Sequence, residues 1–386
     1  MKTIAKMDKL LFSLMIIFCA LGLIMILSAS SVSTVLRYNV PQYNFFLKQT
    51  VFIIVSFIVG FIILKIPTSK YKYISFLMMV GIIAALVGLF IVGKITNNAQ
   101  SWYNLKFINI QPSEFAKGII IIYMADYYNK INKKKIKSIS TLIFPVTLAL
   151  AVFILVFMQP DLGSALIIGG ITAGIFFSIP VVKKNKKSIL KVLGVGVILA
   201  VAVLMFKGKE ILNSRQMDRF NFQNPCERYQ ESTGYQVCNG FIAINNGGVF
   251  GKGLGNSTQK YLYLPESHTD MIFPIIVEEL GLITGILIVL GYAIMLFRIF
   301  KIAKTATSLR GSIIAFGTLI YLLLHIAINL MGILALIPLT GVPLPFLSYG
   351  GSFTVSIIIM IFIVERVAIE SHQDKSKEKI KKINQK

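Results

Sequence analysis

The stretch LLFSLMIIFCALGLIMILSASSV, residues 10–32, carries no charged side chain over a length that can cross a membrane. About 20 apolar residues in a helix span the roughly 30 Å hydrocarbon core of a bilayer. The chain is 55% hydrophobic and only 14% charged, which is typical of polytopic membrane proteins. The sequence therefore predicts an all-α fold of about ten transmembrane helices. They lie near 10–32, 46–65, 73–94, 113–127, 139–158, 163–181, 188–206, 269–297, 311–337 and 353–369.

The formal net charge of +23 would also fit a nucleic-acid-binding surface, but its distribution favours a membrane topology. With a cytoplasmic N-terminus, 27 of the 39 Lys and Arg residues fall on the cytoplasmic side, including every short Lys-rich loop. We therefore expect a bacterial inner-membrane protein with both termini cytoplasmic and no nucleic-acid partner. A single membrane domain, residues 1–370, precedes a basic tail, 371–386, which we expect to lack fixed structure and to face anionic headgroups.

The first apolar run ends in Ser28-Ala29-Ser30, which resembles a signal-peptidase site. Cleavage there is the alternative to a retained first helix. The apolar stretch is long for a signal peptide, so we expect the helix to be kept.

A long polar segment, about 207–268, separates the seventh and eighth predicted helices and lies outside on this topology. Loops of this length usually carry function. Cys226 and Cys238 lie in it, and an oxidising exterior permits either a disulfide or two free thiols. Its glycine-rich part, 246–255, resembles a nucleotide loop but has Gly253 where a P-loop needs Ser or Thr. We expect tight turns there, with Lys252 and backbone amides able to contact a phosphate.

Titratable side chains gather just before the eighth predicted helix, in YLPESHTD, residues 263–270. A helix cap would explain Thr269 or Asp270 alone, because exposed amides favour an acceptor at a helix N-terminus. A cap needs neither Glu266 nor His268. This segment is therefore a candidate for proton-transfer chemistry.

Two further motifs, QPSEFAK at 111–117 and QPDLG at 159–163, each open a helix after a proline. Glu114 and Lys117 are three residues apart and can pair on one helical face. Charged side chains inside a membrane are costly, so this pair is a functional candidate, with a purely structural salt bridge as the alternative. Glu278 and Glu279 follow in the eighth helix, and at least one must face away from lipid.

The proline-rich segment PLTGVPLPFLSYGGS, residues 338–352, cannot form a regular helix. Non-helical backbone at membrane depth is tolerated only against protein or a wet cavity. We expect an outer re-entrant loop between the ninth and tenth helices, with a packed turn as the alternative.

From about residue 8 to 370 the chain resembles the SEDS proteins (shape, elongation, division and sporulation), which include FtsW, RodA and SpoVE. The resemblance rests on these motifs together with GYQ at 234–236, GKGLGNSTQKYLYLPESHTD at 251–270 and EELG at 278–281. The 259–270 run and the Ser28-Ala29-Ser30 sequence look more like the FtsW and SpoVE branch than RodA. Ser101 stands where family members usually carry an Arg before the Trp.

The resemblance implies a peptidoglycan glycosyltransferase that polymerises lipid II on the outer face, with an FtsW-like role in septal wall synthesis during cell division. It implies Asp270 as the catalytic residue and a class B penicillin-binding protein and other divisome proteins as partners. Candidate substrate-binding residues are Glu114, Lys117, Asp161, Arg215, Arg219, Gln236, Lys252, Glu266, His268, Thr269, Ser348 and Tyr349.

A carboxylate at position 270 is suited to accept the proton of an attacking sugar hydroxyl, while cationic groups or a divalent ion would stabilise the leaving pyrophosphate. A magnesium or manganese ion is possible, although no metal-ligand spacing demonstrates one. The alternatives are a RodA-like elongation polymerase, a SpoVE-like sporulation polymerase, a lipid II flippase or transporter, and an inactive scaffold.

Overall fold

The computed structural model describes residues 6–92, 94–96, 99–105, 108–134, 139–179 and 222–384. Within these ranges, nine of the ten predicted helical segments overlap observed helices. The predicted helix 188–206 lies outside the described residues, as do Arg215 and Arg219.

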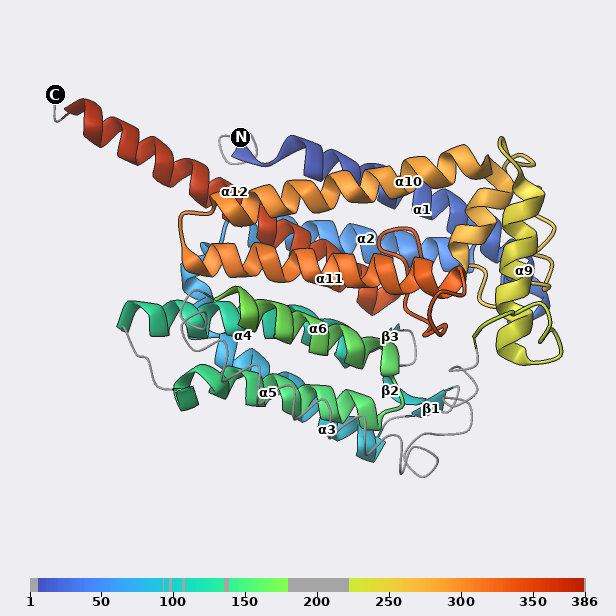
Figure 1. Cartoon of the computed structure of the whole chain (residues 1–386), viewed down its shortest axis with the longest axis horizontal. Coiled ribbons are helices and arrows are strands. Elements are labelled where there is room, and N and C mark those ends of the chain that lie inside the picture. The colour runs from blue at the N-terminus through green and yellow to red at the C-terminus, as the bar shows by residue number, and fades with distance from the viewer. Residues whose placement is uncertain are drawn as a thin grey trace.

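The long helices run side by side and form one bundle (Figure 1). In chain order they are α1 (Lys9–Leu36), α2 (Asn44–Ile63), α3 (Ser75–Val92), α4 (Pro112–Lys134), α5 (Ile139–Met158), α6 (Leu162–Ser178), α10 (Ile272–Thr305), α11 (Leu309–Ile333) and α12 (Gly351–Asn384). A short 3-10 helix, η2 (Thr68–Tyr73), precedes α3.

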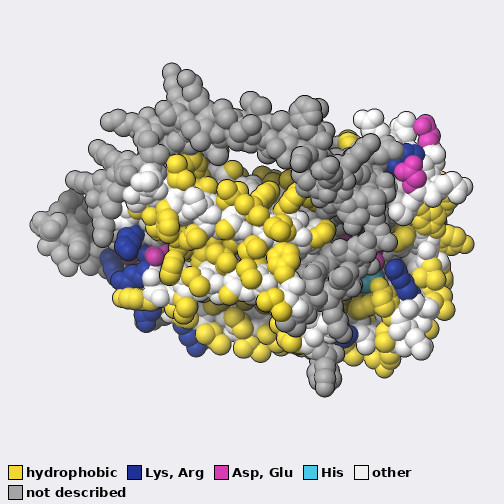
Figure 2. Space-filling model, turned by 90° about the horizontal axis from the view of Figure 1, so that it is seen from below, with side chains coloured by type: hydrophobic (Ala, Val, Ile, Leu, Met, Phe, Trp, Pro, Cys, Tyr) yellow, Lys and Arg dark blue, Asp and Glu magenta, His cyan; other side chains and the backbone are white. Residues whose placement is uncertain are grey.

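Six helices in the described part of the chain are long and apolar enough to cross a membrane: α1, α2, α5, α10, α11 and α12. Apolar stretches of α3 and α6 are shorter, and α4 carries several charged side chains. A hydrophobic band covers the middle of the bundle's described surface, with Lys and Arg side chains gathered near one end (Figure 2). These features make the chain a multi-pass membrane protein.

The bundle has two distinct ends (Figure 1). At one end α1 begins and α12 finishes, and we call this the terminus end. The opposite end carries the helix α9 (Ser232–Gly247), and we call it the α9 end. It also holds a small antiparallel sheet with strand order β1-β2-β3, formed by β1 (Lys94–Thr96), β2 (Ala99–Leu105) and β3 (Ile108–Ile110).

Three local features of the structure differ from the sequence predictions or were not predicted. The outer segment, predicted without a helix, contains α9. The tail beyond Gln373 was expected to lack fixed structure, but α12 continues without interruption to Asn384. The charge content of this segment alone did not predict that the helix continues through it. The small sheet was not predicted at all.

The burial pattern places α12 at the centre and α2 at the periphery. In their most apolar windows, 89% of α12 residues but only 17% of α2 residues are buried. Most side chains of α4 from Ser113 to Tyr128 are also buried, despite its charges. Charged groups on α4 are thus held among protein neighbours rather than lipid, as their desolvation cost requires.

Candidate active site at the α9 end

The segment just before α10 brings the predicted titratable residues together. Glu266 adopts a left-handed backbone conformation with φ +53, and its backbone carbonyl accepts a hydrogen bond from the backbone N–H of Met271 at 3.2 Å. Thr269 Oγ1 donates to Glu266 Oε2 at 2.9 Å and lies 3.3 Å from Asp270 Oδ1. The N-cap position of α10 is Met271, so neither Thr269 nor Asp270 occupies it.

His268 is buried and its ring stacks on Phe45 of α2, with ring centroids 4.6 Å apart. Burial lowers the pKa of this imidazole to about 4, against the opposing effect of Glu266 and with a smaller contribution from Arg37. His268 is therefore neutral near pH 7. Its Nδ1 atom is buried without a hydrogen-bond partner.

Asp270 is only 7% exposed and lies against the loop that joins α11 to α12. Its backbone carbonyl accepts a hydrogen bond from Asn329 Nδ2 of α11 at 2.7 Å. Gly341 in the loop has φ +75, and a Cβ atom placed there would lie 3.7 Å from Asp270 Oδ2. A side chain at 341 would therefore strain the backbone, while its Cβ would lie in ordinary van der Waals contact with the carboxylate.

The loop itself, residues 334–350, contains no helix, and within it Val342 and residues 344–348 are buried. Asn329 Nδ2 also donates to Val342 O at 2.8 Å, and the hydroxyl of Tyr292, within α10, donates to Pro345 O. Phe346 O lies so close to Gly22 of α1 that a Cβ there would be 2.2 Å away. The loop thus reaches the middle of α1 and α10, as expected of a re-entrant segment.

Glu114 and Lys117 form the expected ion pair, with Lys117 Nζ 2.6 Å from Glu114 Oε1 and both side chains buried. Lys117 Nζ also lies 3.2 Å from His325 Nε2 of α11. His325 Nδ1 in turn lies 3.3 Å from Pro343 O. This network therefore joins α4, α11 and the re-entrant loop.

Asp161 caps α6 by accepting a hydrogen bond from the backbone N–H of Ser164 at 3.0 Å. Its second oxygen accepts from Gln111 Nε2 at 2.9 Å and from Ser113 Oγ at 3.3 Å. Gly163, the second residue of the same helix, lies directly against Thr340 and Val342. The two proline-led motifs are thus bonded to each other beside the re-entrant loop.

Residues 340–343 are the meeting point of the site. Gly163 of α6, Asp270 before α10, and Asn329 and His325 of α11 all contact this four-residue stretch. A carboxylate, an imidazole and a buried ammonium group are therefore held around one non-helical backbone segment. Such an arrangement can accept a proton and stabilise developing negative charge.

Glu278 and Glu279 are both buried, and they hold the 251–260 segment. Glu278 accepts hydrogen bonds from Thr258 N and Oγ1 and pairs with Lys252 at 3.3 Å. Glu279 accepts from Ser28 Oγ at 2.7 Å and pairs with Lys260 at 3.0 Å.

The glycine-rich stretch is a set of tight turns, with positive φ at Gly251, Gly253 and Gly255. Lys252, predicted to bind substrate, thus neutralises Glu278 in this structure.

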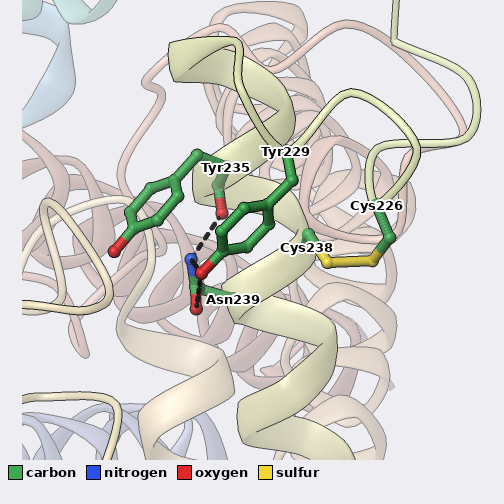
Figure 3. Close-up of a disulfide and its surroundings, with 5 residues drawn as sticks. All are labelled: Cys226, Tyr229, Tyr235, Cys238 and Asn239. Atoms are coloured by element: carbon green, nitrogen blue, oxygen red, sulfur yellow. Dashed lines mark hydrogen bonds between the residues drawn. A yellow bond between two sulfur atoms is a disulfide. The ribbon is translucent and has the colours of Figure 1, made fainter.

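Cys226 and Cys238 form a disulfide that ties α9 to the preceding segment (Figure 3). Tyr229 and Tyr235 pack beside it with ring centroids 4.8 Å apart, and Asn239 Nδ2 donates to Tyr235 O at 2.8 Å. Cys19 is a buried free thiol in α1, as expected. The cross-link and the small buried face of α9 stabilise a helix that its Gly and Asn content made hard to predict.

The other predicted site residues lie around this core. The backbone carbonyl of His268 accepts a hydrogen bond from Tyr349 N at 2.9 Å, and the Tyr349 ring packs on Phe45. Ser348 Oγ accepts from Leu344 N at 2.8 Å and so stabilises the re-entrant loop. Gln236 is half-buried in α9.

Sequence reasoning missed His325 and Asn329, which are central to the site. These two residues are four positions apart on one face of α11, which is mostly apolar. Gln49 of α2 was also missed, and its Nε2 donates to Thr354 Oγ1 at 2.8 Å. The available signal was the polar side chain inside an apolar helix, which marks a functional candidate by default.

Several buried polar atoms at this end have no hydrogen-bond partner: Glu114 Oε2, His268 Nδ1, Asn329 Oδ1 and Thr340 Oγ1. Such atoms are costly unless water or a ligand bonds to them. Among the described residues, no group of three His, Cys, Asp or Glu side chains is close enough to hold a metal ion. The four unpartnered atoms named above can therefore bond to water or a ligand at the α9 end.

Comparisons with known proteins cover nearly the whole chain. Residues 8–373 match the family described as cell cycle protein, which comprises FtsW, RodA and SpoVE. The probable peptidoglycan glycosyltransferase FtsW of Bacillus subtilis (strain 168) is 33% identical over 98% of this chain and 94% of its own length. Stage V sporulation protein E of the same organism is 33% identical over 92% of this chain and 94% of its own.

Solved structures share the fold. A chain of a peptidoglycan synthase complex that coordinates polymerisation and crosslinking superposes with a TM-score of 0.74 at 20% identity, over 95% of this chain and 99% of that one. The rod shape determining protein RodA of Thermus thermophilus gives 0.67 at 22% identity, over 95% and 97%. The protein therefore belongs to the FtsW, RodA and SpoVE family of cell cycle proteins.

Proposed function

We propose that this protein is a peptidoglycan glycosyltransferase that polymerises lipid II at its α9 end, with Asp270 as general base. The observation that carries the proposal is the convergence of Asp270, the Glu114–Lys117–His325 network and the Asp161-capped start of α6, through Gly163, on the loop residues 340–343. In support, relatives of similar length bear the name of this activity.

Asp270 would accept the proton of the sugar 4-hydroxyl as that hydroxyl attacks the anomeric carbon of a second lipid-linked sugar. The bond from that carbon to the undecaprenyl pyrophosphate breaks, and the pyrophosphate leaves with the bonding electrons. Glu266 and Thr269 position the carboxylate segment by their mutual hydrogen bonds. A general base typically contributes about 10² to 10⁴ in rate.

Lys117 is fully buried with two partners, so it would act on the leaving group through the local field. Arg215 and Arg219 remain candidate phosphate contacts outside the described residues. A magnesium or manganese ion stays a prediction, to be tested by polymerisation with and without a chelator. The proton transfer and the bond cleavage described above are assigned to residues of the chain and not to a metal ion.

We propose that the α9 end faces the outside of the bacterial inner membrane and that both termini are cytoplasmic. Two observations support this orientation. Basic side chains gather at the terminus end, as the positive-inside rule requires (Figure 2). The disulfide at the α9 end is the kind of bond that persists in an oxidising compartment.

An FtsW-like role in septal wall synthesis is favoured because seven relatives that are 31–34% identical to this chain carry that name. SpoVE-like sporulation and RodA-like elongation are the alternatives within the same chemistry. A class B penicillin-binding protein is the proposed partner, supported by the likeness to a synthase complex that couples polymerisation to crosslinking. Other divisome proteins are further proposed partners.

A lipid II flippase is the main rival from another class, and the location of the polar groups argues against it. Asp270, Asp161 and Glu266 lie at one end of the bundle, whereas transport sites usually lie near the bilayer midplane. Polymerisation of lipid II by the purified protein, with and without the partner, tests the proposal. Glycan strands from the wild type but not from Asp270→Asn support it, and transport without polymerisation would contradict it.

A further inference from the structure

An apolar turn projects from the α9 end just after α9. Gly248 and Gly251 bracket it with φ values of +53 and +83, and between them stand Val249 and Phe250. Phe250 is 84% exposed, the highest value among the described large hydrophobic residues. An aromatic ring left in water loses the favourable free energy of burial, so this exposure indicates an apolar partner outside the chain.

The turn is fixed to α10 by backbone hydrogen bonds in both directions. Lys252 N and Gly253 N donate to the carbonyls of Glu278 and Glu279, each at 2.9 Å. Leu282 N and Ile283 N donate to Gly248 O at 3.0 Å and Val249 O at 3.4 Å. These bonds use the groups released where α10 breaks at Gly281, whose φ and ψ are 85 and 166.

Glycines make this close contact possible. A Cβ atom at Gly251 would lie 2.3 Å from Glu279 O, and one at Gly281 would lie 2.3 Å from Val249 O. Neither backbone could give way without breaking the hydrogen bonds described above. The position of the Val249-Phe250 turn is therefore determined by α10 and is not that of a loose loop.

The turn continues the lipid-facing surface of α10. The side chains of Leu282, Ile283, Ile286 and Leu287 are all exposed on that helix. Leu282 and Ile283 are also the residues whose backbones bond to the turn. Val249 and Phe250 thus lie beside the first exposed apolar residues of a membrane-spanning helix.

The depth of this contact follows from the charges of α10. No charged residue stands between Glu279 and Arg298, and the helical residues 282–297 beyond the break at Gly281 extend about 24 Å. This length covers most of the roughly 30 Å hydrocarbon thickness of a bilayer. Leu282 and Ile283, and with them the turn, therefore lie just inside one edge of the hydrocarbon.

We propose that the Val249-Phe250 turn inserts into the acyl chains of the bulk bilayer lipid in the leaflet at the α9 end. The turn anchors the segment from α9 to Asp270 at a fixed depth beside α10. Its occupant is lipid hydrocarbon, because the turn is continuous with the lipid-facing side of α10. The inference depends on the membrane-spanning fold and not on the proposed enzymatic activity.

Trp102 is the only tryptophan of the chain, so a reporter can be placed cleanly. The full-length Trp102→Phe/Phe250→Trp protein is reconstituted in phosphatidylglycerol vesicles. These vesicles contain no lipid-linked sugars, and part of their lipid carries a spin label near the glycerol end of the acyl chain. The matched control is Trp102→Phe/Ser232→Trp, because Ser232 is exposed beside the charged pair Arg228–Glu231. If the first variant does not elute as a single species, the quenching measurement is repeated with Trp102→Phe/Val249→Trp.

The proposal predicts that the tryptophan at 250 is quenched several-fold more strongly by the spin-labelled lipid than the tryptophan at 232. Aqueous iodide should show the opposite order, and the emission at 250 should be shifted to the blue. Iodide quenching at 250 equal to that at 232, without lipid quenching, overturns the proposal. Protection from both quenchers would also overturn it, since it would mean that a second copy of the chain covers the turn.

Discussion

The two ends of the bundle hold buried charges in different ways. At the terminus end, Arg310 Nε donates to Asp126 Oδ1 at 3.0 Å, and Arg298 Nε donates to Asp8 at 2.9 Å. Both pairs join separate helices through guanidinium–carboxylate contacts. At the α9 end, Lys117 is instead shared between Glu114 and His325.

Backbone conformation shows the same contrast. Most described non-glycine residues with a positive φ lie in segments at the α9 end: Asn39, Asn224, Leu262, Glu266 and Ala335. Left-handed backbone in such residues is costly and tends to gather where a site must be held in one arrangement. The comparison indicates that the terminus end fixes helix packing, whereas the α9 end gives up stability to form a site.

The largest effect is expected at the α9 end, from Lys117→Met. This change leaves Glu114 buried without its cation, which typically costs about 3 to 5 kcal/mol. Thermal denaturation of the protein in detergent should show this loss of stability, and glycan synthesis should fall with it. Glu114→Gln/Lys117→Met should recover most of the stability but not the polymerase activity. Recovered activity in that double variant would make the pair purely structural.

Arg310→Met at the terminus end should cost a similar or slightly smaller amount of stability, because Asp126 keeps a hydrogen bond from Ser75 Oγ at 3.3 Å. Here Asp126→Asn/Arg310→Met should restore both stability and polymerisation per folded molecule. The measurement is a double-mutant cycle in thermal stability and lipid II turnover. A double variant that folds but does not polymerise would contradict the claim that the pair at the terminus end is only structural.

A smaller loss, about 2 kcal/mol, is expected for Asn329→Ala. It removes two buried hydrogen bonds, to Asp270 O and Val342 O, each worth roughly 1 kcal/mol. Turnover should fall more than stability, since the Asp270 backbone loses its link to the loop. Thr318→Ala is the matched control, because its hydroxyl bonds only to Ile314 O of its own helix. Equal effects of the two variants would remove the positioning role of Asn329.

The smallest effect concerns His268 and pH. Its folded pKa is lowered to about 4, below the usual value near 6.5, so the unfolded chain binds the proton first as pH falls. Stability contributed by the neutral ring is therefore full above pH 6.5 and is lost between pH 6.5 and 4. We expect about 1 kcal/mol of loss between pH 7 and 5.5. His268→Phe should flatten that part of the stability curve, and an unchanged slope would contradict the assignment.

Apolar run length was enough to predict the bundle, because each spanning helix must satisfy its own backbone in lipid. The pairing of Glu114 with Lys117 also followed from spacing. The helix α9 was missed because its stability comes from a disulfide and from packing on α10, which local propensity does not reveal. The convergence on residues 340–343 was missed because it joins segments more than 170 residues apart, from Gly163 to Val342.

The most direct test compares one substitution at each end in the same assay. Glycan strand formation from lipid II is measured for the wild type, Asp270→Asn and Asp126→Asn/Arg310→Met, each normalised to the folded fraction. We expect Asp270→Asn to remain folded and to lose about 10² to 10⁴ in rate, while the terminus-end variant stays near wild type. Near-normal polymerisation by folded Asp270→Asn would contradict the account.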